Sequence, residues 1–199
     1  RRARPRAGEL RGRRILLTGA SSGIGEVAAE KLAAQGATVI VVARREHLLA
    51  QVVDRIVAQG GEAIAMATNL ADMDAVDELV QRVGQVDILI NNAGRSIRRP
   101  LLESLERWHD VERTIALNYY APLRLIRGLA PGMVRRGDGH VINVSSWRVM
   151  PESSPLFGVY NASKAALSAV SRVIDTESAE SGVHSTTIYY PLVATPTIA

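Results

Sequence analysis

The sequence predicts a doubly wound α/β fold in which helices cover both faces of an open parallel sheet. Short apolar runs rich in β-branched residues alternate with longer segments of helical period. Several of these runs are apolar throughout, as expected of strands that are buried on both faces. The length of 199 residues suits one domain. We therefore expect a single domain at residues 13–199, preceded by a basic linker or tail at residues 1–12.

Each predicted element follows from this alternation. The six predicted strands are residues 14–18, 38–43, 63–67, 86–91, 140–145 and 185–190. The predicted helices are residues 24–35, 46–59, 73–83, 105–136 and 160–181. Proline removes a helical hydrogen bond, so the fourth helix is expected to break at Pro122 or Pro131. In a sheet of this type ligands bind beyond the carboxyl ends of the strands.

Composition narrows the classes of function. The chain has no cysteine, which excludes disulfides and thiolate metal sites and favours the cytoplasm. No apolar run approaches the roughly 18 residues of a membrane span, and the four histidines lack metal-ligand spacing, so we expect neither a membrane span nor a metal site. The formal net charge is +4, with seven arginines before the first apolar run. This basic tail gives little support to nucleic-acid binding.

A glycine-rich turn joins the first strand to the first helix. Residues 18–25 read Thr-Gly-Ala-Ser-Ser-Gly-Ile-Gly. Glycines permit the tight turn and a close approach of backbone to phosphate, and the first N–H groups of the helix attract an anion. We expect a dinucleotide pyrophosphate here, in contact with Gly19, Ser21, Ser22, Gly23, Ile24 and Gly25.

The second strand ends in Arg44 and Arg45, where enzymes that use NAD typically carry a carboxylate for the ribose hydroxyls. A guanidinium instead suits the 2′-phosphate of NADP. This position therefore predicts NADPH as the cofactor. In the alternative interpretation, the two arginines merely begin an exposed helix.

The helix after the fifth strand carries Tyr160 and Lys164 one turn apart on the same face. An ammonium this close lowers the pKa of a phenol from its usual value of about 10 and brings proton transfer nearer to neutral pH. Nearby, Trp147 and Phe157 fit a substrate pocket and a packed core equally well.

The ordered combination of these motifs resembles the short-chain dehydrogenase/reductase family. It comprises the glycine-rich turn, Asn-Asn-Ala-Gly at residues 91–94, a serine that ends the fifth strand, and Tyr-x-x-x-Lys at residues 160–164. The resemblance covers nearly the whole chain and implies a Rossmann fold that transfers a hydride to a carbonyl. It implies the catalytic residues Asn118, Ser146, Tyr160 and Lys164. Further implied cofactor contacts are Asn69, Leu70, Asn91, Ala93, Gly94, Tyr160, Lys164, Pro191, Val193 and Thr195.

In this resemblance Tyr160 is the general acid, Lys164 lowers its pKa and holds the nicotinamide ribose, and Asn118 supports a proton relay through water. The spacing of fourteen residues between Ser146 and Tyr160 is one longer than the family's, so Ser145 remains an alternative. Asn69 stands where the family has an aspartate, and its amide oxygen also accepts a hydrogen bond.

Residues 91–100, 112–119 and 190–196 resemble more narrowly the bacterial fatty acyl-CoA reductases. That branch reduces acyl thioesters to aldehydes, and its reductase domain can be part of a longer polypeptide. The resemblance implies an acyl thioester or other small-molecule substrate and a homodimer or homotetramer. The chain stops where the family continues, so the sheet is expected to lack the final strand. Arg98 and Arg99 are interpreted as contacts for coenzyme A phosphates or as an ordinary exposed basic pair.

Two other functions fit the same sequence. Reduction of a 3-oxoacyl thioester or another long-chain ketone requires the same four catalytic residues. A non-catalytic NADPH-binding scaffold has no physical reason to keep a phenol one turn from an ammonium.

Overall fold

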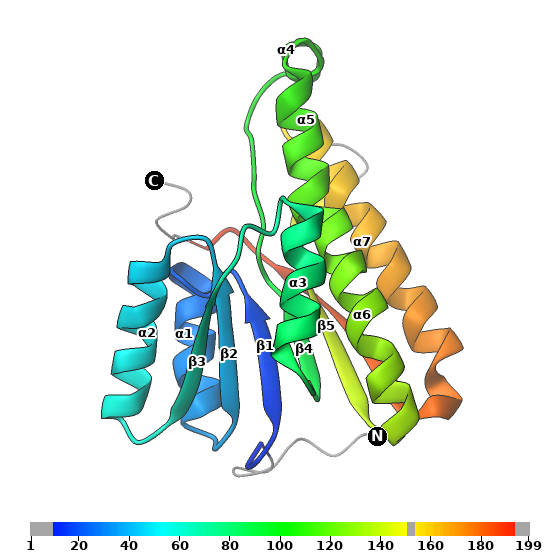
Figure 1. Ribbon diagram of the computed structural model, residues 1–199. Coiled ribbons are helices and arrows are strands. Elements are labelled where there is room, and N and C mark those ends of the chain that lie inside the picture. The colour runs from blue at the N-terminus through cyan, green and yellow to red at the C-terminus, as the bar shows by residue number, and fades with distance from the viewer. Residues whose placement is uncertain (1–9, 151–153, 194–199) are drawn as a thin grey trace.

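The computed structural model describes residues 10–150 and 154–193 and places six parallel strands in one sheet (Figure 1). The strand order is β3-β2-β1-β4-β5-β6. The strands are β1 (Arg14–Thr18), β2 (Thr38–Ala43), β3 (Glu62–Ala67), β4 (Ile88–Asn91), β5 (Gly139–Ser146) and β6 (Val183–Tyr190). The doubly wound fold predicted from the sequence is confirmed.

The direction of strand addition reverses at β1. The chain adds β2 and β3 on one side of β1, then crosses to add β4, β5 and β6 on the other side. Leu16, at the middle of β1, is in register with Ile40 of β2 and Leu89 of β4. Such a switch point opens a crevice at the carboxyl ends of the strands, where ligands of this architecture bind.

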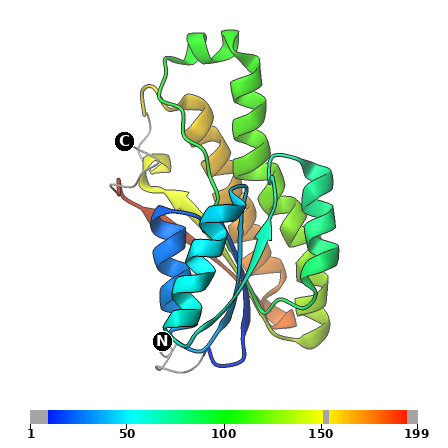
Figure 2. The ribbon, with the colours of Figure 1, turned by 60° about the vertical axis from the view of Figure 1, so that its left-hand side comes forward.

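Two helical layers bury the sheet, as the views in Figures 1 and 2 show. The helices are α1 (Gly23–Ala33), α2 (Glu46–Ala58), α3 (Met73–Val83), α4 (Leu101–Glu106), α5 (Trp108–Ile115), α6 (Ala121–Arg136) and α7 (Gly158–Glu177). One apolar core joins α1 and α2 to the sheet, and a second joins α3 and α6 to its other face. Alternate residues of β1 serve the two cores, because Ile15 belongs to the first and Leu16 to the second.

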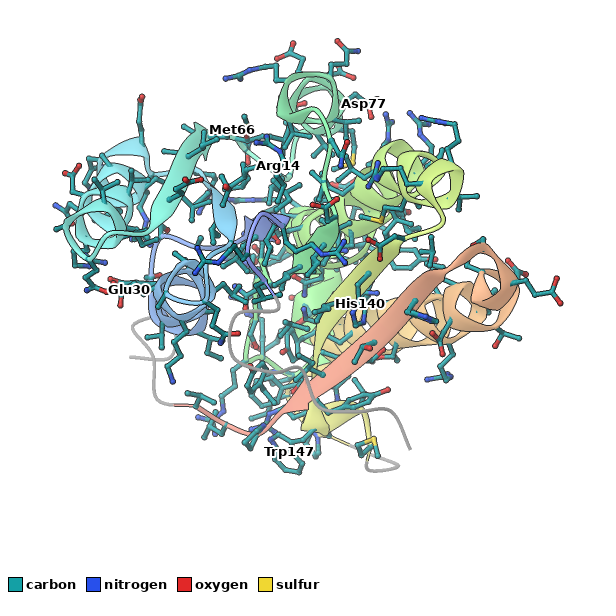
Figure 3. The ribbon with its side chains drawn as sticks, turned by 90° about the horizontal axis from the view of Figure 1, so that it is seen from below. Arg14, Glu30, Met66, Asp77, His140 and Trp147 are labelled. Atoms are coloured by element: carbon teal, nitrogen blue, oxygen red, sulfur yellow. The ribbon has the colours of Figure 1, made fainter. Side chains whose placement is uncertain are left out.

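Ion pairs connect neighbouring helices on each face. Glu30 of α1 lies beside α2 (Figure 3), where its carboxylate is 2.9 Å from Nε of Arg55. On the other face, Asp77 of α3 pairs with Arg124 of α6. These pairs are partly exposed, so each contributes little to stability beside the two apolar cores.

The expectation of one helix at residues 105–136, broken at a proline, is wrong. The break lies at Arg107, between α4 and α5, and five residues after α5 form a π-helical turn, η1 (Ala116–Tyr120). Pro122 directly follows the π-helical turn, and α6 continues through Pro131 to Arg136, so neither proline ends the helix.

Several predicted boundaries shift. β4 begins two residues later than predicted and β6 two residues earlier, and β5 extends to Ser146. A short 3₁₀ turn, η2 (Trp147–Val149), follows β5, and another, η3 (Ala179–Ser181), follows α7. Of the predicted tail at residues 1–12, Leu10 packs against the first core. Residues 1–9 of that tail and the predicted contact Thr195 lie outside the described residues.

Two further findings concern the described residues alone. None of the helices at residues 10–150 and 154–193 combines the length and apolar character needed to cross a membrane. The same residues contain no group of three or more histidine, cysteine, aspartate or glutamate side chains placed to hold a metal ion.

Candidate active site

A cleft of about 880 Å³ lies at the carboxyl edge of the sheet. Segments that follow β1, β2, β3, β4, β5 and β6 line it, together with parts of α5, η1 and α7. Its volume is at the upper end of the roughly 300–1,000 Å³ of ligand pockets. The cleft is therefore large enough for an extended ligand, and it contains most of the residues predicted for the site.

The glycine-rich turn packs directly on the turn that follows β4. Gly19 has a φ of +69°, and a Cβ added there would lie 2.8 Å from Cα of Ala93. A Cβ on Gly25 would lie 2.2 Å from the carbonyl oxygen of Gly19. The hydroxyl of Thr18 accepts hydrogen bonds from the backbone N–H groups of Asn92 and Ala93, both at 3.0 Å. These contacts explain why the two glycines are required.

The amino end of α1 offers free backbone donors to the cleft. Its N-cap residue, Ser22, has extended backbone and makes no capping hydrogen bond with its side chain. Ser22, Gly23 and Ile24 all line the cleft. Because uncapped N–H groups at a helix start attract anions, this end fits the pyrophosphate of a dinucleotide.

The end of β2 brings positive charge to the same place. Nη2 of Arg45 lies 3.2 Å from Oγ of Ser21 and 3.3 Å from Oγ of Ser22. Arg44 also lines the cleft, and both arginines are exposed. Among the described residues that line the cleft there is no aspartate or glutamate. This arrangement fits a cofactor that carries a further phosphate beside its ribose.

The loop after β3 contributes two of the predicted contacts. Asn69 and Leu70 both line the cleft. Oδ1 of Asn69 accepts a hydrogen bond of 3.3 Å from the N–H of Ala71, while Leu70 is buried in the second core. The Asn69 amide thus lies at the cleft, and its Nδ2 makes no hydrogen bond within the described part of the chain.

The two serines at the end of β5 face different surroundings. Ser146 makes a hydrogen bond with the phenol of Tyr160. Ser145 is held by α7, because it accepts a hydrogen bond of 2.9 Å from Ser168 and donates one of 3.4 Å to the carbonyl of Lys164. The geometry therefore pairs Ser146 with Tyr160, and it ties Ser145 to the core side of α7.

Burial controls the acidity of the central phenol and ammonium. The pKa of Tyr160 is raised by burial, and it is lowered to a smaller extent by the hydrogen bond with Ser146 and the charge of Arg148. Burial lowers the pKa of Lys164 to about 8. Its Nζ donates a hydrogen bond of 2.8 Å to the carbonyl of Val144. The expectation of a net lowering of the Tyr160 pKa is wrong, because desolvation outweighs the two groups that lower it, and Lys164 is not one of them.

Asn118 lies in the π-helical turn and is fully buried. Its Oδ1 accepts the N–H of Arg95 at 2.8 Å, and its Nδ2 donates to the carbonyl of Arg95 at 2.9 Å and to Oγ of Ser163 at 3.0 Å. A Cβ on Gly94 would lie 3.3 Å from Nζ of Lys164 and 3.5 Å from Oδ1 of Asn118. Asn118 thus fixes the loop after β4 against α7, close to the Lys164 ammonium. Irregular helical turns of this type are frequent at functional sites.

Two of the described residues predicted for the site, Asn91 and the fully buried Asn118, do not line the cleft. The side chain of Asn91 is buried and donates a hydrogen bond of 2.9 Å to Asn143 of β5, so it joins two strands. Its neighbours Asn92, Ala93 and Gly94 line the cleft instead. Pro191 and Val193, predicted as contacts beyond β6, also line it.

Comparison with known proteins agrees with this geometry. The family model described as short chain dehydrogenase matches residues 13–199. The chain belongs to the short-chain dehydrogenase family. It is 67% identical over 195 residues to a fatty acyl-CoA reductase of Mycobacterium tuberculosis, and the match covers 96% of this chain and 66% of that protein. A fatty acyl-CoA reductase of Acinetobacter baylyi is 47% identical, with 96% of this chain and 65% of that protein covered. The chain therefore spans about two thirds of the length of these curated relatives.

Solved structures of other short-chain dehydrogenases share the fold. A metagenomic short-chain oxidoreductase in complex with NADP is 33% identical with a TM-score of 0.84, and the match covers 93% of this chain and 83% of that one. A 3-oxoacyl (acyl-carrier-protein) reductase from Agrobacterium tumefaciens, with NADP bound, is 32% identical with a TM-score of 0.89. That match covers 96% of this chain and 74% of the reductase.

Within this short-chain dehydrogenase cleft, one charged residue next to the phenol, Arg148, is not among the residues predicted from the sequence. The guanidinium carbon of Arg148 lies 4.1 Å from the ring centre of Phe157 and 5.3 Å from that of Trp147. Phe157 in turn meets Tyr160 edge to face, with the ring centres 6.4 Å apart. Both aromatic residues line the cleft, which decides the earlier alternative between pocket and core in favour of the pocket. The one available signal was the position of Arg148 two residues after Ser146.

Proposed function

We propose that this chain is an NADPH-dependent reductase that converts a fatty acyl-CoA to an aldehyde. The observation that carries the proposal is the convergence of Ser146, Tyr160 and Lys164 in the cleft that also holds the glycine-rich turn. The two fatty acyl-CoA reductases among the relatives support the choice of substrate. Because this chain spans about two thirds of their length, the activity is proposed for a protein that includes it.

The proposed cofactor site follows the cleft from β2 to β4. The uncapped amino end of α1 holds the pyrophosphate, and Arg44 and Arg45 hold the 2′-phosphate. Solved family members with NADP bound support this choice. NADPH, when bound, supplies the hydride that reduces the substrate carbonyl. The Lys164 ammonium, next to Gly94, is placed to hold the nicotinamide ribose.

Two side chains act on the carbonyl oxygen. Tyr160 donates its phenolic proton to that oxygen, and Ser146 stabilises the developing negative charge by a hydrogen bond. With a thioester, the resulting hemithioacetal returns its hydroxyl proton to the Tyr160 phenolate as its C–S bond breaks, which releases the thiolate of coenzyme A and leaves an aldehyde. The raised pKa of Tyr160 keeps the phenol protonated at neutral pH, as a general acid for reduction requires. In this proposal Asn118 acts by positioning, because it fixes the loop after β4 beside Lys164.

A second candidate is reduction of a 3-oxoacyl thioester to its hydroxyacyl product. The structural similarity to a 3-oxoacyl reductase favours it, and it uses the same proton donor. The two reactions differ in the fate of the thioester bond, because only aldehyde formation releases free coenzyme A.

The absence of cysteine from the sequence fits a reducing compartment, and we propose that the protein acts in the cytoplasm. We also propose that it assembles as a homodimer or homotetramer.

The experiment compares palmitoyl-CoA with a 3-oxoacyl-CoA while NADPH absorbance and free thiol are recorded together. The proposal predicts that palmitoyl-CoA consumes NADPH and releases thiol in equal amounts. Tyr160→Phe is expected to slow this reaction by roughly 10²- to 10⁴-fold, the usual contribution of a general acid. NADPH consumption with the ketone alone, without thiol release, would replace the proposal by the second candidate.

A further inference from the structure

The cleft contains more positive charge than its cofactor half explains. Its described lining residues include seven cationic side chains and no acidic one: Arg44, Arg45, Arg95, Arg98, Arg113, Arg148 and Lys164. Arg44 and Arg45 follow β2, on one side of the switch point at β1. The other arginines follow β4 and β5 or lie on α5, on the opposite side. A cleft lined by one sign of charge concentrates ligands of the opposite sign.

A single carboxylate, that of Asp110, separates the paired arginines of this region from the unpaired ones. Asp110 of α5 is nearly buried, and hydrogen bonds from Arg99 and Arg107 lower its pKa to about 2, so it stays ionised. Its oxygens lie 2.7 Å from Arg95, 3.0 Å from Arg99 and 3.1 Å from Arg107. Arg98 and Arg113 make no ion pair within the described part of the chain, although both line the cleft. Only one residue of the predicted pair at 98–99 is thus available to a ligand.

The segment that carries Arg98 is fixed at both ends. The N–H of Arg95 donates to Asn118 at 2.8 Å, and the N–H of Arg99 donates to the carbonyl of Leu156 at 2.8 Å. The Asp110 ion pairs hold the side chains of Arg95 and Arg99 as well. Since binding then needs little reordering of the backbone, Arg98 is placed in advance for its ligand.

Arg113 approaches the same half of the cleft from α5. Leu117, one turn further along the chain, also lines the cleft, so this face of α5 and η1 runs from the exposed guanidinium inward. Glu112, its neighbour in sequence, is exposed and is not among the described lining residues. The positive charge of Arg113 is therefore not balanced by any acidic side chain among the described residues that line the cleft.

We propose that Arg98 and Arg113 form a docking site for the phosphate groups of coenzyme A, in the half of the cleft opposite Arg44 and Arg45. This inference rests on the proposed acyl-CoA substrate. The flexible pantetheine arm separates those phosphates from the thioester, so they bind away from Tyr160 while the thioester reaches it. Guanidinium groups suit such phosphates because they donate paired hydrogen bonds.

The test uses the full-length protein with Arg98→Gln, Arg113→Gln and the double variant, and Arg135→Gln as a matched control. Arg135 is an exposed arginine of α6 that does not line the cleft. The two substrates are palmitoyl-CoA and the palmitoyl thioester of N-acetylcysteamine, which has the same reacting carbonyl and no phosphate. Each cleft variant is expected to raise KM for palmitoyl-CoA roughly tenfold or more and to leave kinetics with the phosphate-free thioester unchanged.

Calorimetric binding of coenzyme A and of adenosine 3′,5′-bisphosphate, with NADP⁺ saturating, separates this inference from the reaction itself. The variants should weaken both ligands by the same factor as KM, with no change in NADPH affinity, and Arg98→Lys should recover part of the loss. If coenzyme A binds in this way while no thiol is released, the docking site stands and the proposed reaction fails. Equal losses with the two thioesters, or unchanged coenzyme A binding, would overturn the docking site even if the reaction is confirmed.

Discussion

Arg148 stacks on the ring of Phe157, with its guanidinium carbon 4.1 Å from the ring centre. The stacking holds a positive charge beside Tyr160, where it lowers the pKa of the phenol against the opposing effect of burial. A cation can be held by an aromatic face without a carboxylate partner, so no acidic side chain is needed to position this charge. The relationship links the acidity of Tyr160, the proposed proton donor, to a residue outside the family's motif.

We therefore predict that Arg148→Gln raises the pKa of Tyr160. Reduction needs the protonated phenol, and its rate falls as pH rises through this pKa. The alkaline limb of the kcat profile for reduction should consequently move to higher pH, whereas Arg148→Lys should move it less. The profile is measured with saturating NADPH; an alkaline limb that stays in place in Arg148→Gln contradicts the assigned electrostatic effect.

The two serines at the end of β5 should differ sharply when each is replaced by alanine. Ser146→Ala removes a hydrogen bond to the reacting oxygen and should lower kcat roughly 10²- to 10³-fold. Ser145→Ala removes a buried bond to α7 and should cost about 1 kcal/mol of unfolding free energy with little change in kcat. Urea unfolding and initial rates measured on both variants test the assignment, which fails if Ser145→Ala has the larger effect on kcat.

Cofactor preference should depend on the arginines after β2. Arg44→Asp replaces a hydrogen-bond donor to the 2′-phosphate by a negative charge that repels it. The change should weaken NADPH binding roughly 10- to 100-fold. NADH lacks the 2′-phosphate and should be little affected. Fluorescence titration with both cofactors measures this, with Arg82→Asp, an exposed arginine of α3, as the control. Equal weakening of NADPH and NADH would remove the argument for a 2′-phosphate site.

Buried Lys164 should make the cofactor-free fold more stable at mildly alkaline pH. Its pKa falls from 10.5 to about 8 on folding, so between these values the unfolded chain binds more protons. Stability then rises with pH, by about 2 kcal/mol from this group between pH 7 and 9.5. Lys164→Met should remove this contribution, while Lys31→Met, at an exposed site on α1, should retain it. Urea unfolding at the two pH values decides; an identical pH dependence in both variants would refute the assignment.

Gly25→Ala is expected to disturb the cofactor turn through its backbone. The added Cβ would lie 2.2 Å from the carbonyl oxygen of Gly19, and this backbone atom cannot move aside as the end of a flexible side chain could. A loss of at least 1 kcal/mol in unfolding free energy should accompany weaker NADPH binding. The matched change Gly132→Ala, inside α6, meets only the ends of two arginine side chains, at 3.4 and 3.8 Å, and should stabilise the helix by up to about 1 kcal/mol. Similar outcomes for the two variants would contradict the close packing described for the turn.

Much of the fold could be predicted because the strands are buried on both faces. The run of β2 has four fully buried residues from Val39 to Val42. Such a run is apolar throughout and cannot be mistaken for a strand or helix with one polar, exposed face. The break at Arg107 could not be predicted, because it depends on the three-arginine contact with Asp110 and not on a local helix breaker. The π-helical turn could not be predicted either, because its residue Asn118 makes hydrogen bonds to a loop distant in sequence and to α7.

The site was predictable where its residues form a contiguous motif. Gly19 to Gly25 and the Tyr160–Lys164 pair are local patterns, and the cleft brings them together. The direction of the Tyr160 pKa was not predictable, since spacing shows a nearby ammonium but not how much water the fold removes. The position of Arg148 beside Tyr160 was not predictable for a similar reason, because its stacking partner Phe157 lies nine residues further along the chain.

The π-helical turn at Ala116–Tyr120 has a consequence for how this protein tolerates insertions and deletions. Removing one residue there would let the segment become regular α-helix. Everything before the turn would then rotate by about 100° about the helix axis relative to α6. The α5 face that now borders the cleft would turn away from it while α6 stayed packed in its core. One extra residue in a single helical turn therefore sets the rotational alignment between the part of this helix that packs on the sheet and the part that borders the cleft.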